Sequence, residues 1–296
     1  MKPLQTIGIH SPGDMGHSVG QRLRENGLRV IAHVADRSTR TQALAREAGI
    51  EAVPSYQALV QESDVILSIL VPAQAMAAVD LVADAIAETG ADVLYADCNA
   101  IAPQTARKGA ARITDAGGRF VDASIIGGPP RGEYTPRIYA SGAEADVLAL
   151  LNDCGLNIIV MSDRVGDASA LKMCFASLTK GSTALYAQLM TAAKALGIDE
   201  TLKAEFAGSM PDRLRSIERG LPRVPVKARR FVGEMEEMAK MYESLGMMPS
   251  MLAGAAEMYR IIGRTPLADR VPEDDSPFPS LDEALAMFVA ALPGER

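Results

Sequence analysis

Residues 7–20, IGIHSPGDMGHSVG, have the composition of a phosphate-binding turn between a strand and a helix. Gly13 would let the backbone approach a pyrophosphate. Gly16 would let the next helix pack closely, with its N-terminal N–H groups aimed at the anion. Ser11 stands where the dinucleotide-binding fingerprint has its first glycine, and we expect its φ to stay negative, which Pro12 favours. This turn alone does not separate a dinucleotide site from an ordinary strand–helix turn.

A second group of residues that could bind a nucleotide lies about 20 positions further on, at the end of the second expected strand. Asp36 could bind the ribose hydroxyls of NAD. Arg37, Ser38 and Arg40 offer two cations and a hydroxyl to the 2′-phosphate of NADP. The two interpretations conflict, and we favour NADP. Ser38 could also be the N-cap of the helix that follows.

The elements that must position these residues are short β-type runs alternating with helical patterns. This alternation predicts an α/β, Rossmann-like, doubly wound parallel sheet in a first domain, residues 1–163. We expect its strands at Thr6–Ile9, Arg29–Val34, Asp64–Val71, Val93–Ala96, Phe120–Ile126, Arg137–Ala140 and Asn157–Met161.

The pattern changes after residue 163, and residues 164–296 predict an all-helical second domain. Its first helix, 168–196, has no proline and would be ~40 Å long at 1.5 Å per residue. A helix of that length usually crosses between domains or subunits, so we expect a homodimer or a higher homo-oligomer. Further helices are expected at 200–210, 212–219, 227–245, 249–263 and 281–292.

Composition excludes several classes of function. The formal net charge of −7 argues against a nucleic-acid partner. The three cysteines are not closely spaced, and the three histidines all lie within the first 33 residues, so no metal site is expected. We find neither a signal peptide nor a membrane-spanning run, and we expect a cytoplasmic protein whose partner is a small-molecule substrate.

Four further motifs come at the ends of expected strands or at the start of the long helix: ILSILVP (66–72), YADCNAIAP (95–103), VDASIIGGPP (121–130) and VGDASALKMC (165–174). With these motifs the chain resembles the β-hydroxyacid dehydrogenase superfamily, which includes 6-phosphogluconate and 3-hydroxyisobutyrate dehydrogenases. The resemblance covers the first domain and the start of the long helix. The remaining C-terminal segment looks like a less characterised branch.

The resemblance implies roles for individual residues. It makes Lys172 the catalytic residue and places Met15 beside the nicotinamide. Cofactor-binding residues would be Ser11, Pro12, Gly13, Asp14, Met15, Gly16, Asp36, Arg37, Ser38, Arg40, Val71, Pro72 and Asn99. For the substrate the resemblance implies the glycine pair Gly127 and Gly128, and we add Ser124, Asn99 and Arg131 as expected substrate-binding residues because the chain departs from the superfamily pattern.

This sequence also departs from the superfamily pattern at positions that face the substrate. Ile126 replaces the serine before the glycine pair, and Phe175-Ala176 replaces an asparagine pair after the lysine. Ser124, Asn99, Ser177 and Arg131 are candidate replacements for the lost polar groups. The type of reaction is therefore better supported than the identity of the substrate.

Lys172 has the surroundings that a proton-transfer lysine needs. A free lysine has a pKa of ~10.4 and is a poor base at neutral pH. Its neighbours in the expected helix are mostly apolar, and burial would lower the pKa toward the working range. A lysine that merely extends its charged end to the surface is the alternative.

The expected function is an NAD(P)-dependent oxidoreductase that transfers hydride between the nicotinamide and a small β-hydroxy acid or related carbonyl compound. The alternatives are an imine reductase-like enzyme and a dinucleotide-binding sensor or scaffold without turnover. An S-adenosylmethionine methyltransferase would leave the 166–176 motif unexplained. Outside the motifs we expect a surface position for Lys180, a solvated face at Glu234, Glu236 and Glu237, and core or subunit-interface positions for Met235, Met238, Met241, Met247, Met248 and Met251.

Overall fold

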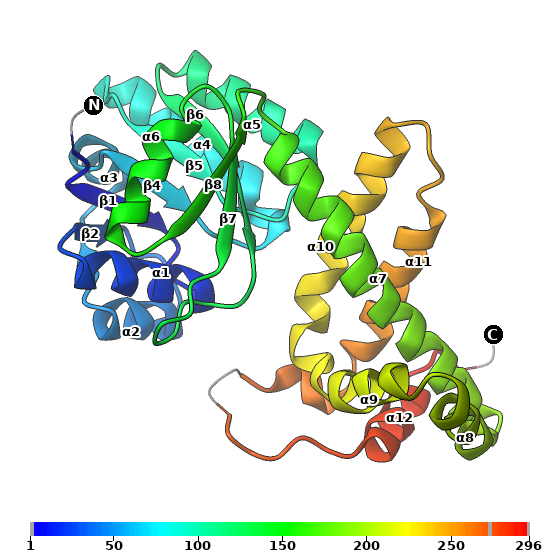
Figure 1. Cartoon of the computed structure of the whole chain (residues 1–296). Coiled ribbons are helices and arrows are strands. Elements are labelled where there is room, and N and C mark those ends of the chain that lie inside the picture. The colour runs from blue at the N-terminus through cyan, green and yellow to red at the C-terminus, as the bar shows by residue number, and fades with distance from the viewer. Residues whose placement is uncertain (1–2, 272–273, 295–296) are drawn as a thin grey trace. The chain divides into compact units, whose positions relative to one another are not determined.

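The computed structural model describes residues 3–271 and 274–294. It divides the chain into two compact units, Met1–Met173 (unit 1) and Cys174–Arg296 (unit 2). Helix α7 (Asp167–Ala195) begins in unit 1 and continues into unit 2 (Figure 1). The long helix expected over 168–196 is thus present within one residue of its predicted bounds. No helix of the described residues is both long enough and apolar enough to cross a membrane.

Unit 1 contains an eight-stranded sheet in the order β3-β2-β1-β4-β5-β6-β7-β8. The chain builds outward from β1 to β3 and then crosses to β4 on the other side of β1, which is the doubly wound arrangement. The predicted fold class is confirmed. The strands are β1 (Thr6–His10), β2 (Arg29–Ala32), β3 (Glu51–Ala52), β4 (Val65–Ser68), β5 (Leu94–Asp97), β6 (Arg119–Ile126), β7 (Arg137–Ser141) and β8 (Asn157–Ser162).

The sheet departs from a fully parallel one at its β7–β8 edge. Strand β7 pairs antiparallel with β6, and β8 pairs parallel with β7, so these two strands run against the other six. The connection 127–136 contains no helix, and a parallel pairing would need a crossover of a dozen or more residues. The expectation of parallel strands is therefore wrong at this edge.

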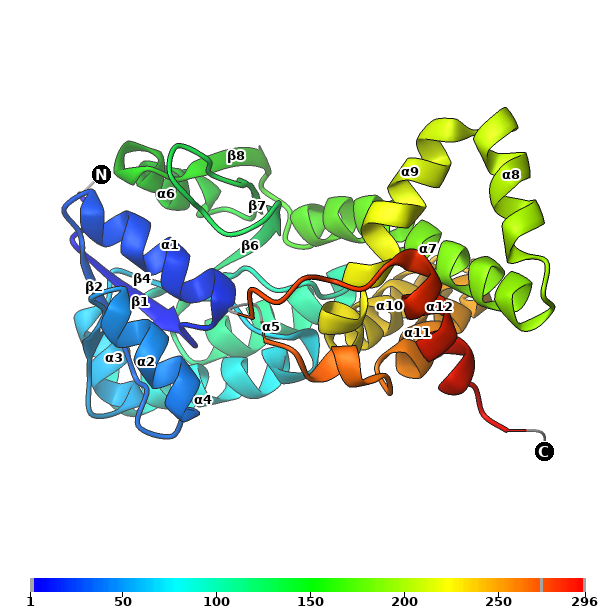
Figure 2. The ribbon, with the colours of Figure 1, turned by 90° about the horizontal axis from the view of Figure 1, so that it is seen from below.

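Helices cover both faces of the sheet, because successive residues of each strand point to opposite sides. Leu67, Ala96 and Val121 belong to one apolar cluster, together with residues of α1 (Asp14–Glu25) and α6 (Ala145–Ala149). Ile66, Tyr95 and Phe120 belong to the other, with residues of α3 (Tyr56–Glu62), α4 (Ala75–Thr89) and α5 (Pro103–Asp115). Figure 2 shows α1 and α3 on opposite sides of β1 and β4. Helix α2 (Thr39–Glu47) follows β2.

Unit 2 is helical over its described residues, as the sequence predicts. It contains the rest of α7, α8 (Asp199–Ser209), α9 (Pro211–Gly220), α10 (Pro225–Ser244), α11 (Ser250–Ile262) and α12 (Leu281–Ala290). Its core includes Met235, Met238 and Met241 on α10, Tyr259 on α11 and Phe288 on α12. Core positions for these three methionines are confirmed.

Other expectations for unit 2 are wrong. Glu234 and Glu237 are only 4% and 7% exposed, so α10 does not carry a solvated acidic face there. Lys180 is half-buried and forms an ion pair with Glu234, which explains how both charges can leave the surface. Met247, Met248 and Met251 are exposed, so a core position is wrong for them, while the expected alternative of a subunit interface stays a prediction.

Candidate active site

The turn after β1 has a strained residue where the sequence predicted none. Ser11 has a φ of +73°, in the left-handed region that favours glycine, and the expectation of a negative φ is wrong. The turn is closed by the Gly13 N–H, which donates to the Ser11 carbonyl oxygen at 2.8 Å. Serine here costs about 1–2 kcal/mol relative to glycine. The turn therefore keeps the backbone shape of the glycine fingerprint without its first glycine.

The rest of the turn fits a bound pyrophosphate. A Cβ atom on Gly16 would lie 2.6 Å from the Ser11 carbonyl oxygen, so only glycine allows α1 to start this close to β1. Gly13 is the N-cap residue of α1, and no side chain caps the N–H groups of the first turn. A Cβ on Gly13 would meet nothing within 4 Å, which leaves room for a ligand. The Asp14 carboxylate would repel an anion, but it is paired with Arg40.

The residues after β2 differ in how far other parts of the protein engage their side chains. Ser38 is the N-cap of α2 and accepts a hydrogen bond from the Thr41 N–H, as expected. Arg37 donates to His10 Nε2 at 2.9 Å and to the Tyr56 hydroxyl at 3.2 Å, both through one nitrogen. Asp36 has a side chain 91% exposed. Arg37 is thus held beside His10 and Tyr56, whereas most of the Asp36 side chain is open to solvent.

Five buried polar side chains lie in one row across the sheet, at the carboxyl ends of β1, β4 and β5 and then on β6 and β7. His10, Ser68, Asp97, Asp122 and Ser141 are paired in register from β1 through β4, β5 and β6 to β7. Each is at most 2% exposed. Directly paired residues project to the same face of a sheet. We call these five residues the polar row. A row of this kind is costly unless its members are hydrogen-bonded or serve a ligand.

Asp122 of the polar row holds the start of α7. Its Oδ2 atom accepts from the N–H groups of Gly166 and Ser169 and from the Ser141 hydroxyl, at 2.9–3.1 Å, and its Oδ1 atom accepts from the Ser169 hydroxyl at 2.6 Å. Burial raises the pKa of this carboxyl, and the donors from Ser169, Ser141 and Gly166 oppose the rise. A carboxylate from a neighbouring strand therefore caps the helix that carries Lys172.

Asp97 and His10 are the two members of the polar row that each keep a buried polar atom, Asp97 Oδ2 and His10 Nδ1, without a hydrogen-bond partner among the described residues. The Oδ1 atom of Asp97 accepts from the Asn99 N–H at 2.9 Å. Burial raises the pKa of this carboxyl to about 7, while the Asn99 N–H and the positive charge of Lys172 act in the opposite direction. Lys172 is half-buried, one turn beyond Ser169 on α7. The positive charge of Lys172 thus favours the ionised form of Asp97, whereas burial favours the neutral form.

The expected substrate residues lie in different surroundings. Ser124 is fully buried on β6, and its hydroxyl has no hydrogen-bond partner among the described residues. Gly127 and Gly128 follow β6 and are exposed, with the Gly128 N–H donating to the Tyr134 hydroxyl at 3.3 Å. Arg131 is exposed in the same loop and exchanges backbone hydrogen bonds with Tyr134.

The remaining site candidates lie at the ends of β4 and β5. Asn99 is buried. Its side chain donates to the Ser68 hydroxyl and accepts from the Leu70 N–H, so it joins the ends of β4 and β5. Val71 and Pro72 follow β4, and Pro72 begins a short 3₁₀ helix, Pro72–Gln74. Met15 on α1 is half-buried and packs against the apolar cluster to which other residues of α1 belong.

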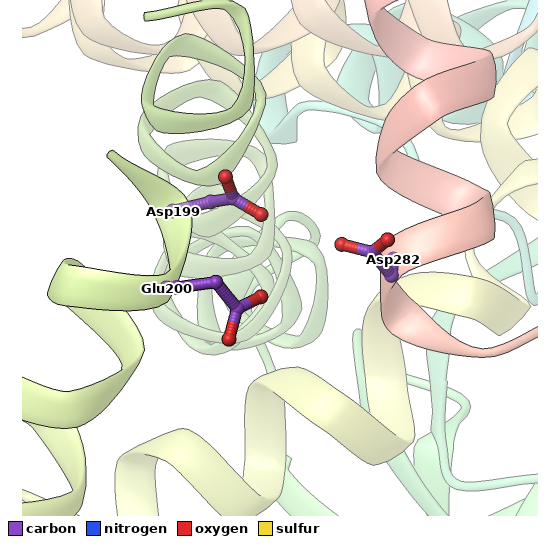
Figure 3. Close-up of side chains that lie close together, drawn as sticks. All are labelled: Asp199, Glu200 and Asp282. Carbon is purple, nitrogen blue, oxygen red and sulfur yellow. The ribbon is translucent and has the colours of Figure 1, made fainter. Parts of the chain in front are cut away.

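One group of carboxylates among the described residues has ligand atoms close enough to share a cation. Asp199 and Glu200 on α8 point toward Asp282 on α12 (Figure 3). Lys194 contacts Asp199 and Asp282, and Lys203 contacts all three carboxylates. These lysines already balance most of the negative charge, so the cluster is an ion-pair network that fastens α12 to α8.

Two carboxyls of the site, Asp97 and Asp122, were not among the expected functional residues. Both belong to motifs recognised in the sequence, and both follow apolar strand residues that the fold buries. An aspartate within or directly at the end of an otherwise apolar, buried strand is the signal that could have identified them. Ser141 and Ser169 carry no such signal, because only the tertiary structure brings them to Asp122.

An open turn at a helix N-terminus, at the carboxyl ends of a doubly wound sheet, defines a dinucleotide-binding protein of the Rossmann class. The comparisons with known proteins agree. The sequence pattern of the NAD binding domain of 6-phosphogluconate dehydrogenase matches residues 6–161, and a domain of unknown function, DUF1932, matches residues 193–262. The chain therefore belongs to the 6-phosphogluconate dehydrogenase-like family of NAD-binding, hydroxyacid dehydrogenase-like proteins.

Individual relatives extend this likeness over most of the chain. An uncharacterised 28.5 kDa protein from Methanothermus fervidus is 30% identical over 200 residues, 67% of this chain and 74% of the relative. The solved structure of MTH1747, a conserved protein of unknown function described as similar to 3-hydroxyacid dehydrogenases, is 31% identical. It covers 87% of this chain and 97% of its own, with a TM-score of 0.63.

Better characterised proteins share the fold at lower identity. Mycobacterium tuberculosis 3-hydroxyisobutyrate dehydrogenase is 18% identical, covering 96% of this chain and 98% of its own with a TM-score of 0.66. Imine reductases, including Myxococcus stipitatus enzymes in complex with NAD+ and with NADP+, match with TM-scores of 0.55 and 0.53. At these identities the likeness establishes the fold alone.

Proposed function

We propose that this protein is an NAD(P)-dependent oxidoreductase acting on the CH–OH group of a small β-hydroxy acid or on the related carbonyl compound. The observation that carries the proposal is the placement of Lys172. Lys172 lies one turn beyond the start of α7, which Asp122 of β6 caps, and its charge acts on Asp97 at the end of β5. Ligands of doubly wound sheets bind at these strand ends.

The chain's own residues would hold the cofactor at the β1–α1 turn. The uncapped N–H groups at the start of α1 face the position for a pyrophosphate, and Gly13 leaves room for it. Arg37 would meet the 2′-phosphate of NADP through the guanidinium nitrogens that His10 and Tyr56 do not use. The nicotinamide supplies hydride transfer when bound. Because Asp36 is exposed beside Arg37, NAD remains the alternative cofactor.

Lys172 would move the proton that accompanies hydride transfer. In oxidation its amine accepts the hydroxyl proton of the substrate, and in reduction its ammonium donates a proton to the carbonyl oxygen. The tie between Asp122 and the first turn of α7 would fix the direction of the helix, and with it the position of Nζ. The proposed polar contacts to the substrate are Gly128, Arg131 and Asn99. Ser124 would join them only after a movement that exposes its buried hydroxyl.

The two parts of the chain would have different roles in this enzyme. Residues 1–163 would bind the cofactor, and residues 164–296 would contribute to substrate binding and to dimerisation. Several large apolar side chains of α7 and of the residues near its end are exposed in the single chain: Phe175, Leu178, Leu185, Leu196 and Ile198. A second subunit is the natural cover for such residues.

A substrate panel tests the proposed function. Purified protein is incubated with NADP or NAD and a set of small 3-hydroxy acids, and with the reduced cofactors and the corresponding aldehydes or ketones, while the absorbance of the reduced nicotinamide is followed. We expect turnover of at least one hydroxy acid–carbonyl pair. Turnover of cyclic imines alone would favour an imine reductase, and tight cofactor binding without any turnover would favour a sensor.

A further inference from the structure

The guanidinium of Arg37 is held by two uncharged side chains. Its Nη2 atom donates to His10 Nε2 at 2.9 Å and to the Tyr56 hydroxyl at 3.2 Å. No carboxylate among the described residues forms an ion pair with Arg37. Arg40, three residues further on, is paired with Asp14 instead. The partners of Arg37 therefore fix the direction of its side chain and leave its positive charge uncompensated.

The two partners of Arg37 belong to a packed group of rings from three elements. His10 ends β1, His33 follows β2 directly, and Tyr56 begins α3. The centre of the Tyr56 ring lies 5.3 Å from that of His10 and 5.0 Å from that of His33. His33 Nδ1 donates to the Val53 carbonyl oxygen at 3.0 Å, which fixes its ring. The packing of these rings thus holds both acceptors in place for Arg37.

His10 must be neutral to accept from Arg37. A guanidinium only donates, so His10 Nε2 carries a lone pair and the ring hydrogen is on Nδ1. Burial lowers the pKa of His10 to about 3, and the charges of Arg37 and His33 act in the same direction. The Nδ1 hydrogen has no acceptor among the described residues, and His10 is only 2% exposed. A buried donor left unpaired costs stability, so its retention calls for a functional reason.

A neutral partner differs from a carboxylate in what it leaves for a ligand. A carboxylate would bind the Arg37 guanidinium more strongly, but the pair would have no net charge and would attract an anion only weakly. With His10 and Tyr56 as partners, the guanidinium keeps its full positive charge and the N–H donors on its other nitrogens. Arg37 is half-buried after β2, where an arginine of a doubly wound fold binds the 2′-phosphate of NADP.

We propose that His10 and Tyr56 are positioning residues that hold the uncompensated guanidinium of Arg37 for the 2′-phosphate of NADP, and that they thereby make the protein prefer NADP to NAD. The inference rests on the proposed function, because it concerns the cofactor of that enzyme. Neither His10 nor Tyr56 contacts the phosphate in this scheme. Both act through Arg37, so their replacement should matter only while Arg37 is present.

A double-mutant cycle in cofactor binding tests the inference. Isothermal titration gives the dissociation constants of NADP and NAD for the natural protein, His10→Phe, Arg37→Ala and the double variant. His10→Phe removes the acceptor and keeps an aromatic ring beside Tyr56. We expect it to raise the NADP dissociation constant about tenfold or more, as for loss of a hydrogen bond to a charged group, and that of NAD less than about twofold. In the Arg37→Ala background it should have no further effect, and additive losses would overturn the proposal.

His33→Phe is the matched control. It makes the same change in the other histidine that contacts Tyr56, whose own polar contacts are Val53 and Asp36. The ratio of NADP to NAD affinity should stay within about twofold of the natural value. A loss equal to that in His10→Phe would assign the effect to ring packing and overturn the proposal.

Tyr56→Phe is the milder variant if His10→Phe does not fold. It removes only the hydroxyl that accepts from Arg37, and the ring remains beside His10. It should raise the NADP dissociation constant about threefold to tenfold and leave that of NAD nearly unchanged. An unchanged NADP affinity in Tyr56→Phe would contradict the role of this residue.

Histidine ¹⁵N NMR without cofactor tests the hydrogen bond itself. His10 should stay neutral between about pH 5 and pH 8 with its hydrogen on Nδ1, and Arg37→Ala should move its Nε2 signal. Titration of His10 near its ordinary value of 6.5 would overturn the inference.

The binding data separate this inference from the proposed function. A natural protein that binds NAD at least as tightly as NADP would refute the inference and leave the oxidoreductase proposal standing. A protein that binds neither cofactor would refute both.

Discussion

Two lysines on α7, eight residues apart in the sequence, lie in contrasting surroundings. Lys180, in unit 2, forms an ion pair with Glu234, and its Nζ lies 4.7 Å from the centre of the Phe231 ring. The Tyr259 hydroxyl donates to its backbone carbonyl oxygen at 2.6 Å. Lys172, in unit 1, follows a helix start capped by Asp122, and its charge acts on the incompletely satisfied Asp97.

The difference teaches how the two units use polar groups. In unit 2 the buried charges compensate one another, which fixes α7, α10 and α11 but leaves little capacity for a ligand. Within the described part of unit 1, the Asp97 Oδ2 atom and the Ser124 hydroxyl are buried without a hydrogen-bond partner, and the backbone at Ser11 is strained. Such features cost stability and persist where they serve binding or catalysis.

The largest expected effect separates the two lysines by activity. Lys172→Met should lower turnover by about 10²–10⁴-fold, the range for loss of a general acid or base, while cofactor affinity changes little. Lys172→Arg should not restore activity, since a guanidinium does not release its proton. Steady-state rates and cofactor titration by fluorescence provide the measurement. Near-normal turnover in the Met variant would make Lys172 an ordinary helix lysine.

The second expected effect concerns stability in unit 2. Glu234→Ala should destabilise the protein by about 3 kcal/mol, because it leaves Lys180 half-buried without its partner. The double variant Lys180→Met, Glu234→Leu should recover most of that loss, since two apolar side chains replace the pair. Urea unfolding measures both. If the double variant is as unstable as Glu234→Ala, the unpaired charge of Lys180 is not the cause of the lost stability.

A smaller effect, on cofactor affinity, is expected from replacing Arg37, which follows β2 in unit 1. Arg37→Ala should weaken NADP binding by about 1–3 kcal/mol through loss of a charge-assisted contact, and should leave NAD binding nearly unchanged. Isothermal titration with both cofactors measures the difference. The matched control is Arg46→Ala, a basic residue in the last turn of α2. Equal losses for both cofactors, or a preference of the natural protein for NAD, would assign cofactor choice to Asp36.

The smallest effect tests the strained turn. Ser11→Gly should stabilise the protein by about 1 kcal/mol, because glycine adopts a φ of +73° without steric cost. Ser18→Gly, inside α1, should have the opposite sign, with a loss of about 0.5 kcal/mol from lower helix propensity. Unfolding free energies of the two variants decide the question. A loss of stability in Ser11→Gly would show that the serine side chain, rather than the backbone, matters here.

Much of the fold and part of the site could be predicted from local sequence. Alternating apolar runs and glycines located most strands, and the proline-free segment located α7 within one residue at each end. The Ser38 N-cap was also predicted correctly, because a cap depends only on adjacent residues. The direction of β7 was not, since strand direction depends on what the connection can span.

The sequence by itself determined the classes of the two units, the glycine turn that fits a pyrophosphate and the family that the chain resembles, because these depend on periodicity and short motifs. Only the tertiary structure decided the rest. Lys180 meets Glu234 across 54 residues, and Asp122 meets Ser169 across 47. Burial raises the pKa of Asp97, and that burial exists only in the folded chain. Charge and desolvation act through space, so residues far apart along the chain set the chemistry of each site.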